Sequence, residues 1–262
     1  MEQNKSGAIA VIDSGVGGIS VLRELIKLMP DEKYIYFADS KNAPYGTKSK
    51  DEVRDIMLEN TEKLLSLGVK AIVVACNTAT SAAVRVMREK YPNVPIVGIE
   101  PAIKPAVEEN GNSTIVVMAT PLTLAEEKFR TLSERFADKA EIIPLPCPGL
   151  MEIIEDGNTE GDIVDSYLKE TFAVLGGKIP DAVVLGCTHY PFVKDAVWKY
   201  FGDNTRIYDG GVGTAKEAKR RIIEVGLENI STANTPEIEF ISTNGDERVT
   251  SLCVKLIEKD ID

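Results

Sequence analysis

The sequence predicts an α/β fold made of two similar domains, each with a mainly parallel sheet, and three observations support this prediction. Short apolar runs rich in Val and Ile alternate along the chain with longer amphipathic stretches. The runs are continuously apolar, which is typical of parallel strands that helices cover on both faces. One such run in the first half is repeated in the second half, and a chain of 262 residues is long enough for two domains.

Each predicted strand is a short apolar segment, and each predicted helix begins at a capping signal. We expect strands at residues 8–13, 33–38, 71–76, 96–99, 114–119, 182–187, 206–208 and 237–242. Ser49 and Glu52 have the spacing of a capping box, so a helix is expected from there to Gly68. Thr120-Pro121 and Tyr190-Pro191 are expected to begin helices that reach residues 136 and 201. Strands that alternate with helices form parallel sheets through right-handed crossovers.

The repeated run ends in a cysteine each time. Residues 69–78 and 180–189 each contain an apolar strand that ends in Cys76 or Cys187, followed by polar residues and a helix. A duplicated α/β unit explains the similarity. Chance is the alternative, because apolar strands that end in a small residue are common.

Composition and charge exclude several classes of function. Lys and Arg number 30 against 41 Asp and Glu, and a net charge of −11 disfavours nucleic acid and anionic membrane surfaces as partners. No apolar run is long enough to span a membrane, and the first residues lack a signal-peptide core. Four cysteines without a CxxC pair fit a reducing cytoplasm rather than a disulfide scaffold. A single histidine, His189, excludes His-based metal cages, so no metal site is expected.

The two strand-end cysteines are the best candidates for chemistry. Ligands of open parallel sheets bind at the carboxyl ends of the strands, and a helix that begins there lowers the pKa of a thiol. Asp13 is expected beside Cys76, and His189 follows Cys187 by two residues. A single cysteine of this kind is more simply a buried structural residue. Two in matched contexts favour catalysis, because inverting a carbon needs one proton carrier on each face.

Other strand ends offer donors for an anionic substrate. Ser14, Asn77, Thr78, Thr120 and Thr188 carry hydroxyl or amide groups near expected helix starts, although each alone could be only a helix cap. The glycine-rich turn at residues 13–18 is neither a GxGxxG fingerprint nor a P-loop. Binding of a dinucleotide is therefore disfavoured.

Four motifs together resemble the glutamate racemases, the cofactor-independent members of the aspartate/glutamate racemase group. They are DSGVGG (13–18), PYG (44–46), ACNTAT (75–80) and GCTHYP (186–191). The resemblance implies two α/β domains with the active site in the cleft between them, here residues 1–98 with 208–262, and an inserted domain at 99–207. It also implies a cytoplasmic homodimer that interconverts L- and D-glutamate for peptidoglycan synthesis without a cofactor.

The resemblance also assigns roles to individual residues. Cys76 and Cys187 become the two acid/base thiols, assisted by Asp13 and His189. An auxiliary glutamate follows Cys147-Pro148, where the spacing before Gly157 favours Glu155 over Glu152. The implied substrate-binding residues are Asp13, Ser14, Pro44, Tyr45, Gly46, Asn77, Thr78, Thr120, Thr188 and His189.

Two other functions stay open on the sequence alone. An aspartate racemase of the same group would use the same thiols on a shorter substrate. A non-catalytic module that binds a metabolite or nucleotide would use the glycine-rich turn but leave both thiols without a task.

Overall fold

A computed structural model gives the structure of the chain and describes residues 5–125, 127–229 and 236–258. These residues form two compact units. The first contains the chain up to Glu100 and the chain from Gly211 onward, and the second contains Pro101–Gly210. The boundaries expected from the sequence, after residues 98 and 207, lie slightly before these, because strand β8 (Arg206–Asp209) pairs within the second unit as far as Asp209.

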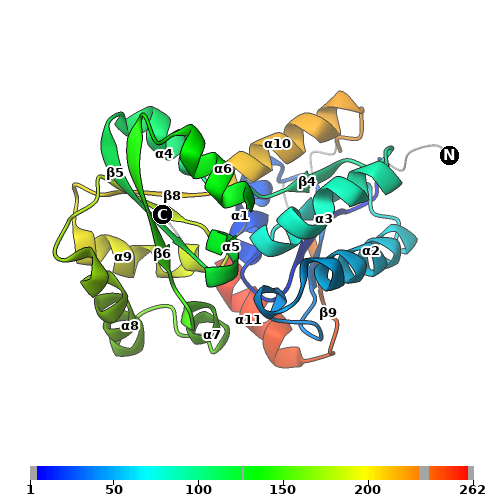
Figure 1. Cartoon of the computed structure of the whole chain (residues 1–262). Coiled ribbons are helices and arrows are strands. Elements are labelled where there is room, and N and C mark those ends of the chain that lie inside the picture. Colours follow the sequence, from blue (N-terminus) through cyan, green and yellow to red (C-terminus); the bar gives the residue numbers. More distant parts are fainter. Residues whose placement is uncertain (1–4, 126, 230–235, 259–262) are drawn as a thin grey trace. The chain divides into compact units, whose positions relative to one another are not determined.

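The first unit has a five-stranded sheet whose neighbouring strands are all parallel, in the order β4-β3-β1-β2-β9. Figure 1 labels its two edge strands, β4 and β9. Its elements in chain order are β1 (Ile9–Asp13), α1 (Ile19–Leu28), β2 (Lys33–Ala38), the 3-10 turn η1 (Tyr45–Thr47), α2 (Lys50–Ser66), β3 (Ala71–Val74), α3 (Asn77–Lys90), β4 (Ile96–Gly98), α10 (Gly211–Glu224), β9 (Glu237–Ser242) and α11 (Glu247–Glu258). The capping box is confirmed: Ser49 Oγ accepts from the Glu52 N–H, and the Glu52 carboxylate accepts from the Ser49 N–H.

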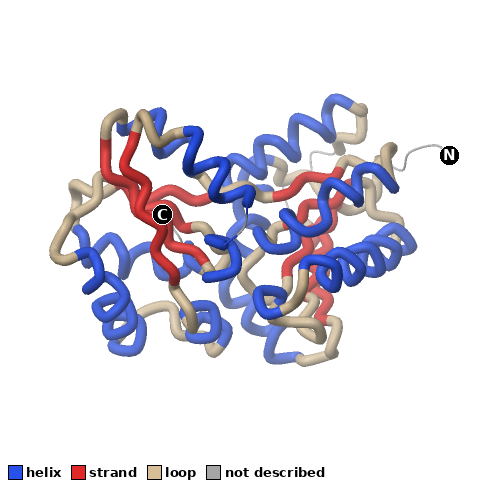
Figure 2. The backbone as a smooth tube through the Cα atoms, in the orientation of Figure 1, coloured by secondary structure: helices blue, strands red, loops and turns tan. Residues whose placement is uncertain are grey.

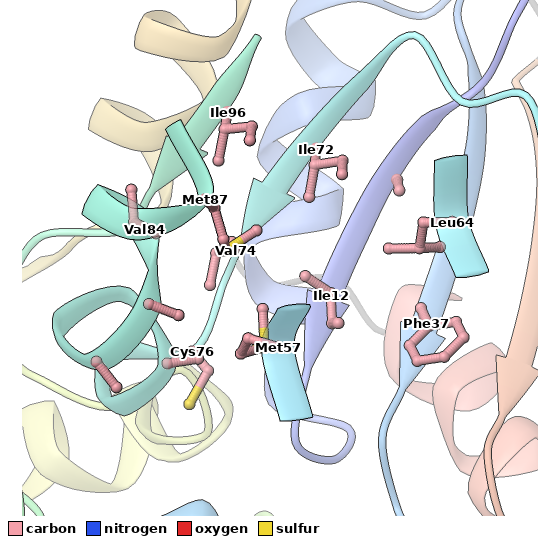
Figure 3. Packing of buried hydrophobic residues seen from close by; sticks show 14 of the residues in the cluster. Ile12, Phe37, Met57, Leu64, Ile72, Val74, Cys76, Val84, Met87 and Ile96 are labelled. Atoms are coloured by element: carbon pink, nitrogen blue, oxygen red, sulfur yellow. The ribbon is translucent and has the colours of Figure 1, made fainter. Parts of the chain in front are cut away.

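Helices cover both faces of this sheet. On one face, β1, β2 and β3 pack against α2 and α3 in a buried cluster that includes Ile12, Val74 and Met57 (Figure 3). On the other face, α1 packs against α10 and α11. Burial of both faces explains why the IAVID segment of β1 is apolar at nearly every position. Cys76 lies at the edge of the cluster, just beyond the end of β3 (Figure 3).

The second unit has a four-stranded parallel sheet in the order β6-β5-β7-β8. Figure 2 shows the strands of each unit in red with helices around them. The elements in chain order are α4 (Ile103–Asn110), β5 (Ser113–Ala119), α5 (Pro121–Ala125), α6 (Glu127–Arg135), β6 (Ala140–Pro146), α7 (Leu150–Glu155), α8 (Asp162–Phe172), the 3-10 turn η2 (Ala173–Leu175), β7 (Ala182–Leu185), the 3-10 turn η3 (Tyr190–Val193), α9 (Lys194–Phe201) and β8. One face of the sheet packs against α4 and α6 in a second buried cluster.

The two sheets share the same topology, which confirms two similar α/β units. Read from the edge, β4-β3-β1-β2 corresponds to β8-β7-β5-β6, and β9 is an additional strand of the first sheet. Backbone bonds repeat as well. The Ala75 N–H donates to Ile12 O at 2.8 Å, and at the equivalent place the Gly186 N–H donates to Met118 O at 2.7 Å. The repeated sequence therefore reflects a repeated structure.

Several elements differ from the sequence-based prediction. Strand β6 was not predicted. β3 and β7 end at Val74 and Leu185, so both cysteines lie two residues past their strands rather than at the last strand position. The helix expected over 122–136 is described as α5 and α6, on either side of position 126, which lies outside the described residues. Within the ranges described, no helix combines the length and the apolar character that crossing a lipid bilayer requires.

Candidate active site

The first unit places Cys76 at the carboxyl edge of its sheet. Cys76 is the N-cap residue of α3, and it is buried. The partial positive charge at a helix N-terminus stabilises a thiolate at this position. Asn77 and Thr78 are the first two residues of the same helix. Among the described residues, the buried Asn77 Oδ1 atom has no hydrogen-bond partner.

Asp13 ends the neighbouring strand β1. Because Ala75 N–H bonds to Ile12 O, the residues that follow, Asp13 and Cys76, leave the sheet side by side. Asp13 is 1% exposed, and its Oδ1 atom accepts a hydrogen bond from the Gly15 N–H at 3.0 Å. The sequence-predicted neighbours Asp13 and Cys76 are thus brought to one edge, and the buried Ser14 follows directly.

A close backbone approach fixes the turn that follows Asp13. Tyr36 Oη donates to Gly15 O at 2.7 Å. A Cβ atom on Gly18 would lie 2.8 Å from the Asp13 Cβ and 3.0 Å from the Ala75 Cβ. Glycine at position 18 therefore lets α1 begin directly against Asp13.

The PYG segment forms η1 and the residue before it. Tyr45 is buried, and its hydroxyl donates to the Asp39 carboxylate at 2.6 Å. Burial raises the pKa of Tyr45, and the charges of Asp39, Cys76 and Asp13 raise it further. Tyr45 is therefore a neutral donor near the thiol of Cys76. Pro44 and Gly46 on either side are half-buried.

The second unit places Cys187 two residues past β7, where it is half-buried. Cys187 Sγ lies 3.6 Å from His189 Nδ1, and His189 Nε2 lies 2.6 Å from Glu155 Oε1. The His189 side chain is 2% exposed and the Glu155 side chain is 28% exposed. Thiol, imidazole and carboxylate thus form one continuous chain of hydrogen bonds.

This arrangement favours a protonated imidazole. Burial alone lowers the pKa of His189, but its hydrogen bonds to Cys187 and Glu155, and the charges of both groups, raise it well above its ordinary value. A charged imidazole next to a thiol stabilises the thiolate and can return a proton to it. Of the two glutamates of α7 that the sequence left open, Glu155 contacts His189, while Glu152 is exposed.

Two threonines complete the edge of the second sheet. Thr120 caps α5: its Oγ1 accepts from the Thr123 N–H at 3.2 Å and lies 2.9 Å from Thr123 Oγ1. Thr188 is buried, and in the sequence it stands between Cys187 and His189. Thr120 directly follows β5, as the sequence predicted, whereas Thr188 lies three residues past the end of β7.

The other cysteines are structural. Cys147 is 1% exposed and its thiol donates to Leu145 O at 3.4 Å. Burial and the nearby charge of Cys187 raise the pKa of Cys147 to about 12. Cys253 is buried in α11.

Two residues with a polar role at this edge were not singled out from the sequence. Asn60 of α2 and Thr243, which follows β9, both donate to the Asp39 carboxylate. The signal for Asn60 was available, because an amide stands there on an otherwise apolar helix face. The position of Thr243, distant in the chain, carries no local signal.

Comparisons with known proteins identify the family of the chain. The sequence model of the family described as Asp/Glu/Hydantoin racemase matches residues 9–218. Glutamate racemases of Clostridium botulinum and Clostridium acetobutylicum are each 49% identical to the chain, over 97% of it and 98% of the relative.

Solved structures match as well. Glutamate racemase from Francisella tularensis in complex with D-glutamate has a TM-score of 0.83 at 28% identity, covering 99% of this chain and 96% of that one. Escherichia coli glutamate racemase with L-glutamate and the activator UDP-MurNAc-ala has a TM-score of 0.82 at 30% identity, covering 95% of this chain and 94% of that one. With a family match over most of its length and relatives this similar from end to end, the chain belongs to the Asp/Glu/hydantoin racemase family, among the glutamate racemases.

Proposed function

We propose that the protein interconverts L- and D-glutamate by proton transfer at Cα between two cysteines, Cys76 and Cys187, and so supplies D-glutamate for peptidoglycan synthesis. The observation that carries the proposal is the repeat. In two units of the same topology, a cysteine follows the equivalent strand at the equivalent position, β3 in one and β7 in the other. The Clostridium botulinum and Clostridium acetobutylicum relatives, which match 97% of this chain, are glutamate racemases.

The chemistry needs one thiolate and one thiol in each turnover. The thiolate takes the Cα proton, so the Cα–H bond breaks and an S–H bond forms. The thiol on the opposite face then gives its proton to the carbanion, and its own S–H bond breaks. After one turnover the two cysteines have exchanged protonation states, and the reverse reaction starts from that arrangement.

In this proposal, each cysteine has a neighbouring side chain that helps to move its proton or to stabilise its thiolate. Asp13 lies beside Cys76 at the edge of the first sheet, where a carboxylate can accept or return a proton. His189 contacts Cys187 and is held by Glu155. The helix N-terminus of α3 adds stabilisation to a thiolate at Cys76.

Most of the substrate-binding residues of the proposal supply neutral donors. They are Ser14, the segment Pro44–Gly46, Asn77, Thr78, Thr120 and Thr188, with Asp13 and His189 also in contact with the substrate. Hydroxyl, amide and backbone N–H groups bind carboxylates without adding charge. A chain with a net charge of −11 must capture an anion by such local donors, because its overall field repels it. The four free cysteines fit a reducing compartment, so we place the reaction in the cytoplasm.

Cysteine variants assayed in deuterated buffer test the proposal. The wild-type protein should racemise both enantiomers of glutamate, incorporate deuterium at Cα, and act on glutamate in preference to aspartate. Cys76→Ser and Cys187→Ser should each lose at least about a hundredfold in kcat, the usual contribution of a general acid or base. Cys253→Ser, a matched substitution at a buried structural thiol, should retain activity. Undiminished racemisation in either of the first two variants would contradict the two-thiol mechanism.

A further inference from the structure

Asp39 is a buried carboxylate to which four side chains donate hydrogen bonds. It follows β2 and is 0% exposed. The donors are Tyr45 Oη at 2.6 Å, Thr243 Oγ1 at 2.8 Å, Asn60 Nδ2 at 2.9 Å, and Asn42 Nδ2, which reaches both carboxylate oxygens at 3.0 and 3.1 Å. All four donors are neutral. A buried carboxylate is costly unless its oxygens are satisfied in this way.

The four donors come from three separate parts of the first unit. Asn42 and Tyr45 belong to the loop after β2, Asn60 belongs to α2, and Thr243 follows β9. Thr243 is bound on its other sides too, since its hydroxyl accepts from the Lys41 N–H at 3.0 Å and its own N–H donates to Ala38 O at 3.0 Å. Asp39 therefore ties the loop after β2 to a helix and to the C-terminal part of the chain.

Tyr45 is the member of this network that faces the candidate site. Its hydroxyl lies between Asp39 and the sulfur of Met57, 3.8 Å away. The ring is buried in the same cluster as Cys76. The charge of Cys76 acts on Tyr45 strongly enough to contribute to its raised pKa. A displacement of the Tyr45 ring would thus move the backbone of Pro44–Gly46 relative to the Cys76 end of the sheet.

We propose that Asn60 and Thr243 are positioning residues for the racemase reaction: they orient the Asp39 carboxylate, which fixes the Tyr45 hydroxyl and so holds the Pro44–Gly46 segment in place for the substrate. This inference rests on the proposed function, in which that segment contacts glutamate. In this proposal the two residues act through Asp39 and Tyr45 rather than on the substrate directly. A buried carboxylate with all its donors in place is held in one orientation. When one donor is removed, the carboxylate can adopt other orientations, and the groups that bind to it are no longer fixed.

Thr243→Val is the variant that isolates this effect. Valine has nearly the shape of threonine but neither donates to Asp39 nor accepts from Lys41. We expect KM for glutamate to rise about tenfold with kcat changed less than about twofold, since lost substrate binding raises KM alone. Thr243→Ser, which keeps the hydroxyl, should restore the wild-type KM.

Thr61→Val is the matched control. Thr61 is also buried in the first unit, and its hydroxyl donates to Met57 O within α2 rather than to Asp39. The same substitution there should leave KM unchanged. A merely structural role for Thr243 would reduce the fraction of folded enzyme and hence the apparent kcat, with KM unaltered.

A double variant tests the route through Tyr45. If Thr243 acts only by fixing Asp39 and Tyr45, Thr243→Val should add less than about a further twofold to KM in a Tyr45→Phe background, because effects within one network are not additive. Additive increases in KM would overturn the inference, and so would a wild-type KM in Thr243→Val or an equal rise in Thr61→Val.

Hydrogen exchange separates this inference from the proposed function. The Asn42 N–H donates to Asp39 O and the Lys48 N–H donates to Tyr45 O, so both amides report on the loop directly. Both should exchange faster in Thr243→Val than in the wild type and in Thr61→Val. If the wild-type chain fails to racemise glutamate, the proposed function falls. Independently of activity, unchanged hydrogen exchange at the Asn42 and Lys48 amides in Thr243→Val would refute the positioning role.

Discussion

Replacing Glu155 by Gln tests the chain of contacts that ends on Cys187. The change keeps the size of the side chain and removes its charge next to His189, whose Nε2 atom lies 2.6 Å from Glu155 Oε1. A hydrogen bond to a charged group contributes about 1.5–3 kcal/mol. Because 28% of the Glu155 side chain is exposed, solvent screens part of its charge, and the lower half of that range applies. A loss of ~1.5–2 kcal/mol corresponds to a kcat that is about 10- to 30-fold lower.

The pH dependence of the rate should change in a defined direction. Against the effect of burial, Cys187 and Glu155 hold the pKa of His189 well above its ordinary value. Without the Glu155 charge, the pKa of His189 falls and the imidazole loses its proton at lower pH. The alkaline limb of the pH–kcat profile should therefore move to lower pH in Glu155→Gln. Circular dichroism of both enantiomers of glutamate, followed over a pH series, measures this limb directly.

Glu152→Gln provides the control. Glu152 belongs to the same short helix, α7, but is exposed. Its replacement should leave both kcat and the alkaline limb at their wild-type values. Equal losses in the two variants would mean that α7 matters only as a structural element, and a wild-type profile in Glu155→Gln would refute the role of the carboxylate.

Two further predictions concern reactivity and packing. Iodoacetamide at pH 8 should label Cys187 and leave Cys147 unlabelled, since burial and the Cys187 charge raise the pKa of Cys147 to about 12; peptide mass mapping that finds Cys147 modified first would contradict this. Gly18→Ala should lower the stability of the fold by about 1–3 kcal/mol in a denaturant titration, because the new Cβ lies 2.8 Å from the Asp13 Cβ. Gly213→Ala in α10, where a Cβ meets nothing within 4 Å, should be neutral or slightly stabilising.

The missed strand β6 shows where local patterns fail. Its sequence, AEIIPLP, contains two prolines, and a proline within a short apolar run argues against a strand. β6 is one of the two edge strands of its sheet, so one side of its backbone needs no ladder partner and tolerates proline. Position in a sheet is decided by pairing with distant residues. For that reason, the seven-residue pairing of β6 with β5 could not be predicted from the segment itself.

Some features of the candidate site could be predicted from the sequence, and others could not. Both thiols could be found from the sequence because each ends a repeated apolar run, and the parallel-strand rule places such ends at one edge of a sheet. The contacts that surround the thiols join residues far apart in the chain, such as His189 and Glu155, or Asp39 and Thr243. The local sequence pattern does not predict which of several carboxylates or hydroxyls forms a hydrogen bond with a given distant residue. The resemblance favours Glu155 over Glu152, and the folded chain shows that Glu155 is the one that contacts His189.

The unequal surroundings of the two thiols have a consequence for Glu155→Gln. L- and D-glutamate have the same free energy in solution, so the equilibrium constant of racemisation is one and kcat/KM must be equal in both directions for every variant. Cys187 has an imidazole and a carboxylate behind it, whereas Cys76 has Asp13 and a helix N-terminus. Removing the Glu155 charge should therefore reduce kcat/KM equally for both enantiomers but divide the loss differently between kcat and KM. The enantiomer whose kcat falls more is the one for which proton transfer at Cys187 limits the rate. A loss of kcat/KM that lies wholly in KM, with kcat unchanged for both enantiomers, would mean that Glu155 acts on binding alone and not on Cys187.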